Sequence, residues 1–346
     1  MALARRGRRH AFDTKRVRRL CHAGAGSFSP AQPGGGRVHT LGTSQNVLFD
    51  GIDAYLEVLR QSRLVALAQE SERTIMRQLR LEDERVQRGS GIAVDVLQAK
   101  SRLQLAKERR INFEGALADA NTRYIEVFDH PPRPSAMQNP APPNDLLPRD
   151  LDQALAIARQ ENPAIDSSLA GVAVAEQGKR LAKARYYPSL DVVAAANREN
   201  DTDLVRGTRT DVSVLLSASW NLFDGFATTA GARQAAAEYK AARQNHDIIE
   251  RDVARQTHLA WNEWTTARQR VELLENAVAI ASEVFEARQK LREAGRETII
   301  NVLDAENEVY NARINLVEAS GDVTRAAFQL LQGMGRLGLA ELGLAK

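Results

Sequence analysis

Few side chains in this sequence are spaced for catalysis or metal binding. There is no P-loop, no Gly-x-Gly-x-x-Gly and no His-Glu-x-x-His motif. The single cysteine, Cys21, excludes an intramolecular disulfide and a cysteine-based zinc site. Acidic pairs such as Glu82 and Asp83 lie on arginine-rich stretches, so we interpret them as solvated faces or i,i+4 ion pairs rather than general acids. The histidines also lack metal-ligand spacing; they are His10, His22, His39, His130, His246 and His258. We predict that the chain is not an enzyme and uses neither cofactor nor metal.

The composition favours long helices over a thick globular core. Of the 346 residues 26% are charged and 5% aromatic, and the 11 prolines are mostly clustered. Residues 1–40 contain nine basic residues and only Asp13 as an acid, whereas the rest has 38 basic and 43 acidic residues. Such a basic arm is compatible with a nucleic-acid tail. Because it lacks interleaved aromatics, we favour a solvated or misassigned leader; no apolar stretch follows its arginines, so it is not a secretory signal.

One pattern occurs twice, 206 positions apart. Gly89 followed by Val96–Ala99 matches Gly295 followed by Val302–Ala305, and the same offset pairs Ala54 with Ala260 without a gap. A duplication of this length indicates that one structural unit is built twice.

Helical spacing, proline and glycine divide the chain into segments. Asp150 is a candidate N-cap for a helix that begins at Leu151, and Pro188 ends the next helix. Residues 226–293 contain no proline and only Gly231, which predicts a helix of roughly 100 Å. The predicted organisation begins with a disordered basic and Gly-rich leader (1–43), a first-repeat helical hairpin (44–129) and a Pro-rich extended linker (130–150). A second repeat (151–338) and a tail (339–346) follow. Within the second repeat we predict helices over 151–187, a β-hairpin over 189–222 and long helices over 226–293 and 297–335.

Both repeats carry a seven-residue pattern with small residues at every second core position. It predicts close helix packing and a left-handed supercoil. In the first repeat Arg110 interrupts the pattern. The core positions are Val302, Val309, Leu316, Val323 and Leu330 with Ala305, Ala312, Ala319 and Ala326, and, in the first repeat, Val96, Leu103, Leu117 and Tyr124 with Ala99, Ala106, Phe113 and Ala120.

The period changes to two in residues 189–198 and 211–222, which predicts two β-strands joined by a polar loop at 199–208. Each run is about 10 residues, the length of a strand that spans a bilayer. A half-buried soluble hairpin has the same alternation, so the pattern alone leaves both possibilities open. In the membrane interpretation Val212, Val214, Leu216 and Trp220 face lipid.

Several short motifs stand in an order typical of one family. They are Asn162–Ile165, Tyr187–Leu190 entering a strand, Ser219–Gly225 leaving one, Ala260-Trp261, Gly295 with Asn301–Glu306, and Tyr310–Ala312. Together they resemble, over roughly residues 44–338, the TolC family of outer-membrane efflux ducts, in particular the outer-membrane components of type I secretion systems.

The resemblance implies a mainly α fold with a small β part. Long antiparallel coiled-coil helices would form a periplasmic tunnel, and a transmembrane β-hairpin would contribute to a barrel in the outer membrane closed by three protomers. The implied function is passive passage of substrate through a homotrimer. The implied partners are outer-membrane lipid, a periplasmic adaptor (membrane fusion) protein and an inner-membrane ABC or RND-type transporter, with no nucleic acid.

The resemblance also implies sites. The Gly-containing turns would meet the adaptor at the periplasmic tip; they comprise Arg88, Gly89, Ser90, Gly91, Ala294, Gly295 and Arg296. Near the tip an acidic ring would constrict the pore, with Asp304 and Asn301 from one repeat and Asp95 and Gln98 as their equivalents in the other. The family often has an aspartate where Asn301 stands, so a trimer of this chain would keep three carboxylates from Asp304. Crowded carboxylates in a narrow pore attract cations.

The chain departs from the family at its start. The partner of the segment that begins at Leu151 would precede Met1, so the first repeat lacks its first helices and its hairpin. Three chains would supply six strands instead of twelve, which leaves little room for a lumen. We expect a truncated gene product or a wrong start codon. The alternatives are a non-functional duct fragment and a soluble coiled-coil scaffold whose basic arm binds nucleic acid or acidic lipid.

Overall fold

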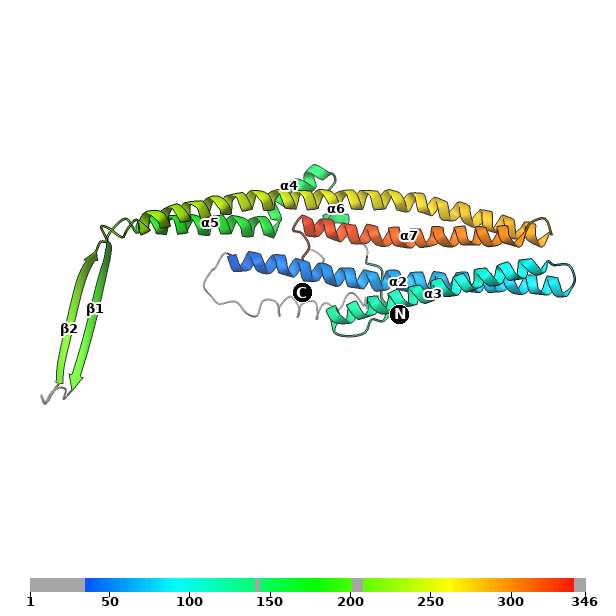
Figure 1. Ribbon diagram of the computed structural model, residues 1–346, viewed down its shortest axis with the longest axis horizontal. Coiled ribbons are helices and arrows are strands. Elements are labelled where there is room, and N and C mark those ends of the chain that lie inside the picture. Colours follow the sequence, from blue (N-terminus) through cyan, green and yellow to red (C-terminus); the bar gives the residue numbers. More distant parts are fainter. Residues whose placement is uncertain (1–34, 141–143, 201–207, 339–346) are drawn as a thin grey trace, which may run out of the picture. The chain divides into compact units, whose positions relative to one another are not determined.

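The computed structural model describes residues 35–140, 144–200 and 208–338 (Figure 1). It is mostly helical with one small antiparallel sheet, which confirms the predicted mainly α class with a small β part. The helices are α2 (Gly35–Gln87), α3 (Ala93–Phe128), α4 (Leu151–Glu161), α5 (Pro163–Ala184), α6 (Ala227–Glu293) and α7 (Ile299–Gly333), and the strands are β1 (Ser189–Asn200) and β2 (Thr208–Ser219).

Helix α2 is longer than the sequence predicts. It begins at Gly35, whereas the predicted first helix begins near Ser44, so the expectation of disorder is wrong for residues 35–43. Adding residues to an existing helix costs little compared with nucleating one, and the amphipathic stretch after Ser44 supplies the nucleus. The rest of the predicted leader, residues 1–34, and the predicted tail, 339–346, lie outside the described residues.

The Pro-rich segment is partly turned rather than extended. It contains two single-turn 3₁₀ helices, η1 (Pro134–Ala136) and η2 (Asn144–Leu146). It is also fixed to α2, because the Tyr55 hydroxyl donates to the Gln138 carbonyl at 2.9 Å and accepts from the Gln138 N–H at 3.0 Å. These two hydrogen bonds reduce the conformational freedom of the linker backbone, although the linker forms no long helix or strand in its described residues.

Helix α4 starts where the sequence predicts, with a side-chain N-cap, and it ends at the C-cap Asn162, whose backbone N–H donates to the Ala158 carbonyl. The Asp150 carboxylate accepts from the Gln153 N–H at 2.7 Å, as expected of an N-cap. At the other end the Asn162 amide donates to the Gly333 carbonyl at 2.8 Å and accepts from the Ala164 N–H at 2.9 Å. The Asn-Pro motif therefore joins α4, the start of α5 and the end of α7.

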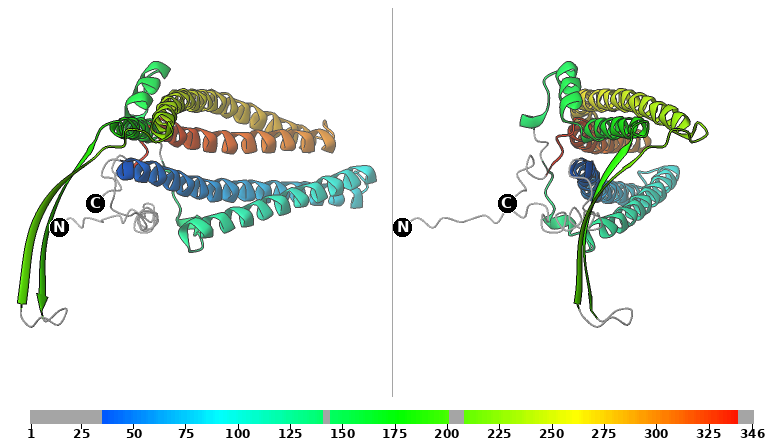
Figure 2. Two further views of the ribbon diagram at one scale, coloured as in Figure 1. Left: turned by 60° about the vertical axis from the view of Figure 1, so that its left-hand side comes forward. Right: turned by 90° about the vertical axis from the view of Figure 1, so that its left-hand side faces the viewer.

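The described parts of Met1–Ala164 and Arg251–Lys346 form one compact helical unit. Helix α2 packs antiparallel to both α3 and α7, as the two views of Figure 2 also show. Most of the predicted core positions are buried; Leu117, Phe113, Leu316, Val323 and Ala312 are partly exposed. The predicted interruption at Arg110 is accommodated by ion pairs with Glu72 at 2.7 Å and Glu114 at 2.6 Å.

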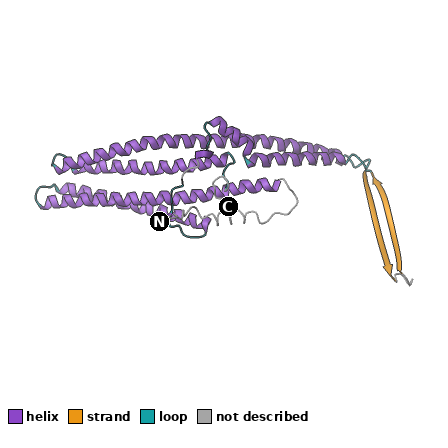
Figure 3. Ribbon diagram, turned by 180° about the vertical axis from the view of Figure 1, so that it is seen from behind, coloured by secondary structure: helices purple, strands orange, loops and turns teal. Residues whose placement is uncertain are grey.

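Ile165–Glu250 form a second, smaller unit. In it α5 runs antiparallel to the first part of α6, with Ser168 Oγ 2.8 Å from His246 Nδ1 and the Lys179 ammonium over the Tyr239 ring at 4.8 Å. Helix α6 has 67 residues, so the predicted rod of about 100 Å is confirmed. Strands β1 and β2 form an antiparallel hairpin (Figure 3).

Candidate functional site

The two predicted tip turns have the same backbone geometry. Gly89 and Gly295 adopt φ angles of 74° and 71°, where a side chain would add strain. The Gly89 N–H donates to Val86 O and the Ser90 N–H to Arg85 O; 206 positions on, Gly295 donates to Arg292 O and Arg296 to Leu291 O. This pair of hydrogen bonds is a Schellman cap, which closes the ends of α2 and α6 alike.

Arg292 connects the two turns through a partly buried ion network. Its guanidinium contacts the Glu82 carboxylate at 2.5 and 3.1 Å and Asp95 Oδ2 at 3.1 Å, and it donates to the Glu297 carbonyl at 2.8 Å. The Arg85 guanidinium reaches the Arg292 carbonyl at 3.3 Å. The Glu82 carboxylate, by its hydrogen bond, raises the pKa of Arg292. The tips of the two helical hairpins are thus tied by charge-assisted hydrogen bonds.

The interpretation of Glu82 as part of a solvated face is wrong. Glu82 is 1% exposed, whereas its neighbour Asp83 is exposed and accepts from Gln87 four residues later at 3.1 Å. Two adjacent helical residues point about 100° apart, so one can face a second hairpin while the other faces water. No pattern in the sequence indicates which helix face meets Arg292.

The four predicted constriction residues do not form one cluster within a single chain. Asp95 belongs to the Arg292 network. The Asn301 amide donates to Glu297 Oε1 at 2.6 Å, and Gln98 is partly exposed on α3. Asp304 is exposed but paired, since its Oδ1 lies 2.6 Å from the Arg102 guanidinium of α3.

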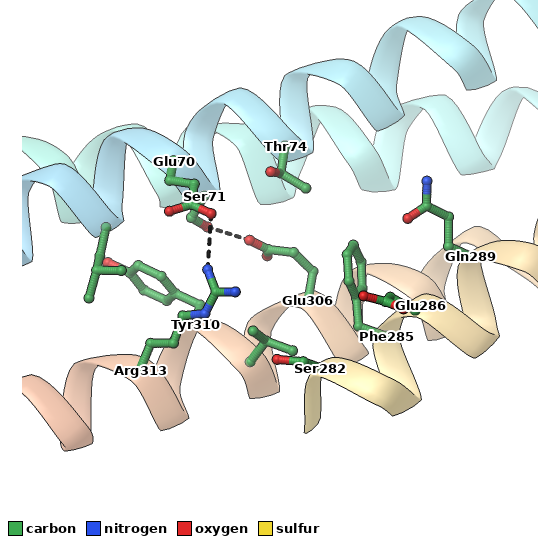
Figure 4. Close-up of a pocket in the computed structure, with 12 residues that line it drawn as sticks. Glu70, Ser71, Thr74, Ser282, Phe285, Glu286, Gln289, Glu306, Tyr310 and Arg313 are labelled. Atoms are coloured by element: carbon green, nitrogen blue, oxygen red, sulfur yellow. Dashed lines mark hydrogen bonds and ion pairs between the residues drawn. The ribbon is translucent and has the colours of Figure 1, made fainter. Parts of the chain in front are cut away.

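A cleft of about 270 Å³ lies farther from the tip, between α2, α6 and α7 (Figure 4). Within it Ser71 Oγ donates to Glu306 Oε1 at 2.7 Å, and Arg313 pairs with Glu70 at 2.9 Å. Burial raises the pKa of Glu306, and the Ser71 hydrogen bond and nearby arginines only partly offset this. Burial likewise raises the pKa of Tyr310, whose ring lies under the Arg109 guanidinium at 5.5 Å.

Sequence reasoning missed the charged residues that join the two repeats. Glu82, Arg102, Arg292 and Glu306 all pair with residues more than 190 positions away. The 206-residue offset could not find them, because it relates equivalent positions and not positions in contact. Within the part of the chain that the structure describes, no group of three His, Cys, Asp or Glu side chains could hold a metal.

The hairpin brings the predicted apolar faces of its two strands together, while Val193 and Leu215 oppose each other on the other face. In its register Val192 lies opposite Leu216, Ala194 opposite Val214 and Ala196 opposite Val212. Directly opposed residues share a face, so the two predicted apolar faces coincide. That face is open: Val212, Val214 and Leu216 are 69–76% exposed.

The strand ends earlier than predicted, at Ser219 rather than Leu222. Trp220 therefore lies just beyond β2, and its indole N–H donates to the Tyr186 carbonyl at 3.2 Å. Gly225, with φ of 65°, and Phe226, with φ of 72°, then turn the chain into α6. As for helices, none in the described ranges offers a stretch of the length and apolarity needed to cross a bilayer.

A family model described as "Outer membrane efflux protein" matches residues 154–336. The chain belongs to this family. The matched range runs from α4 through the hairpin to the end of α7, and the family resemblance predicted from the motifs is confirmed. The family is one of the outer membrane, as the sequence also predicted.

Curated relatives cover most of this chain. It is 26% identical over 303 residues to the outer membrane efflux protein BepC of Brucella suis biovar 1 (strain 1330). That alignment covers 87% of this chain and 65% of BepC. It is also 26% identical over 308 residues to the alkaline protease secretion protein AprF of Pseudomonas aeruginosa. This alignment covers 87% of this chain and 64% of AprF. The chain thus spans less than two thirds of the length of these relatives.

Solved structures share the fold. The outer membrane protein VceC from Vibrio cholerae superposes with a TM-score of 0.74 at 14% identity, covering 93% of this chain and 76% of VceC. The MtrE outer membrane channel of Neisseria gonorrhoeae superposes with a TM-score of 0.71 at 14% identity, covering 87% of this chain and 68% of MtrE. At these identities the likeness establishes the fold.

Proposed function

We propose that this chain is the outer-membrane exit duct of a tripartite efflux or type I secretion system, and that it passes substrate passively as a homotrimer. The observation that carries this proposal is the open apolar face of the hairpin. A two-stranded hairpin is marginally stable in water by itself. Its exposed valines and leucine are stabilised once lipid or neighbouring strands cover them.

The strand length fits a bilayer. Both β1 and β2 have 12 residues, and transmembrane strands of about 9–11 residues cross the hydrocarbon layer at a tilt. Barrel closure satisfies the backbone N–H and C=O groups along the free edges of β1 and β2, which lipid cannot do. The hairpin is therefore assigned to a barrel shared between copies, with Val212, Val214 and Leu216 towards lipid. Trp220, just outside β2, fits the interfacial position that tryptophan favours.

The end of the helical unit that carries the two glycine turns suits an adaptor. The turns at 88–90 and 294–296 are exposed, and Ile92 beside them is 65% exposed. The two turns also carry the basic side chains Arg88 and Arg296. We assign this end to the tip of a periplasmic adaptor, and the energy for transport to an inner-membrane ABC or RND-type transporter, in line with relatives named for efflux and for protease secretion. A passive duct requires no catalytic group.

Reconstitution tests the proposal. The purified full chain should require detergent, cross-link as a trimer and give discrete conductance steps in planar bilayers. A detergent-independent, freely dissolved monomer would instead favour the soluble coiled-coil scaffold. A membrane-inserted trimer that never conducts would identify a non-functional duct fragment.

A further inference from the structure

Asp304 does not present a free charge. Arg102 Nη2 lies 2.6 Å from Asp304 Oδ1, which is hydrogen-bond distance, and the two side chains are 34% and 51% exposed. They come from α3 of the first repeat and α7 of the second, so the pair is made only when both repeats are folded together. Both groups are partly exposed to solvent.

The neighbouring charges are matched in the same way. Seven residues before Arg102, Asp95 is paired with Arg292. Seven residues after it, the Arg109 guanidinium donates to Asn307 Oδ1 at 2.7 Å and lies close to the Glu306 carboxylate. The stretch of α3 that runs beside α7 therefore carries no uncompensated acid at these positions.

A paired carboxylate acts differently from a bare one on an ion in a pore. The field of two opposite charges 2.6 Å apart falls off faster with distance than that of a single charge, and salt screens it further over about 8 Å. A ring of three such pairs has no net charge. A ring of three bare carboxylates would have a net charge of −3.

We propose that Arg102 determines the ionic selectivity of the constriction by neutralising Asp304, so that the duct admits anionic as well as cationic cargo. This inference rests on the proposed function, because selectivity is a property of a conducting trimer. The 206-residue equivalent of Arg102 is Glu308, so the second repeat does not supply the same charge.

The pair can be broken without unfolding the chain. Exposed ion pairs contribute little to stability. Asp304→Asn keeps the length of the side chain, Arg102→Gln shortens it but keeps a hydrogen-bonding end, and each variant removes one charge. The double variant restores a neutral pair and is the matched control.

The first measurement is the reversal potential of the reconstituted full chain in a KCl gradient. We expect the unmodified chain to discriminate weakly between K⁺ and Cl⁻. R102Q should shift the reversal potential towards the K⁺ equilibrium potential, D304N towards that of Cl⁻, and the double variant should return it close to the original value. Strong cation preference in the unmodified chain, or no shift in R102Q, would overturn the inference.

The second measurement does not require conduction. Leu105 is exposed and lies three residues after Arg102, at about 5–6 Å between Cβ atoms. In a Cys21→Ser background, Leu105→Cys supplies one thiol whose reaction rates with cationic and anionic methanethiosulfonates report the local potential in detergent.

R102Q should raise the ratio of cationic to anionic labelling rate about two- to sevenfold, and D304N should lower it by a similar factor. Equal ratios in all variants would overturn the inference even in a conducting channel. If labelling responds as expected but no form conducts, the proposed duct fails and the selectivity role falls with it, although the pair itself is verified.

Discussion

In the helical unit a charged side chain such as Glu82 is buried, whereas in the hairpin apolar side chains such as Leu216 are 69% exposed. Glu82 can be buried because Arg292 lies within 2.5 Å and replaces the hydration it loses. Among the described residues Leu216 has no such compensation, because the described sheet consists of two strands and no described element covers it. The difference teaches that the helical unit is largely self-sufficient, while the hairpin depends on lipid or further strands.

Removing the partner of the buried carboxylate should have the largest effect. Arg292→Met leaves the buried Glu82 with only its longer contact to Arg85, at 3.6 Å, among the described residues. We expect it to lower the free energy of unfolding by about 3 kcal/mol. Guanidinium unfolding followed by helical circular dichroism in detergent measures this. The matched control is Arg88→Met, since Arg88 is 77% exposed and paired only with Glu84, and should cost less than about 0.5 kcal/mol. Equal decreases in the free energy of unfolding for the two variants would contradict the explanation by burial.

A charge on the apolar face of the hairpin should have the next largest effect. Leu216→Arg should destabilise the inserted state by about 2–4 kcal/mol if the residue lies at the bilayer midplane. The control is Ser217→Arg on the opposite face, which should cost much less. Unfolding in lipid vesicles measures both, and a lipid-phase reagent should label a cysteine at 216 faster than one at 217. The reverse labelling order would invert the assigned faces.

The two tip glycines should respond alike and more modestly. Gly89→Ala and Gly295→Ala each place a side chain at positive φ with open space around it, so only backbone strain of about 1–2 kcal/mol is expected. Thermal unfolding of each variant gives the comparison. A difference well beyond this range would mean that the two turns, despite identical hydrogen bonds, are not equivalent in the folded chain.

The smallest expected effect is a change in pH dependence from Glu306. Its pKa in the fold is raised, so the folded chain binds this proton more tightly than the unfolded chain and loses stability as the pH rises from the ordinary pKa through the raised one. The charges facing it are Arg109 on α3, Glu70 on α2 and Arg313 on α7. Glu306→Gln should remove this loss and flatten the curve of stability against pH above the ordinary glutamate pKa. The matched control, Glu308→Gln on the exposed face of the same helix, should leave the curve unchanged.

Much of the fold was predictable because it follows from local patterns. Asp150 begins α4 and Gly89 and Gly295 close their helices, each through a hydrogen bond to the backbone a few residues away. The alternation in residues 189–198 and 211–222 predicted both strands, although β2 ends at Ser219 because period two alone does not mark where pairing stops. The start of α2 at Gly35 was missed because glycine-rich sequence opposes helix formation locally and only continuation from a stable helix overcomes it.

The sequence by itself determined the duplicated helical hairpins, their glycine turns and the two amphipathic strands, because each depends on residue type and period within a few residues. Only the tertiary structure decided which charges meet: Arg292 with Glu82 and Asp95, and Arg102 with Asp304. Those contacts join helices about 200 residues apart in sequence. They depend on the rotation and axial register of packed helices, which no periodicity within a single helix specifies.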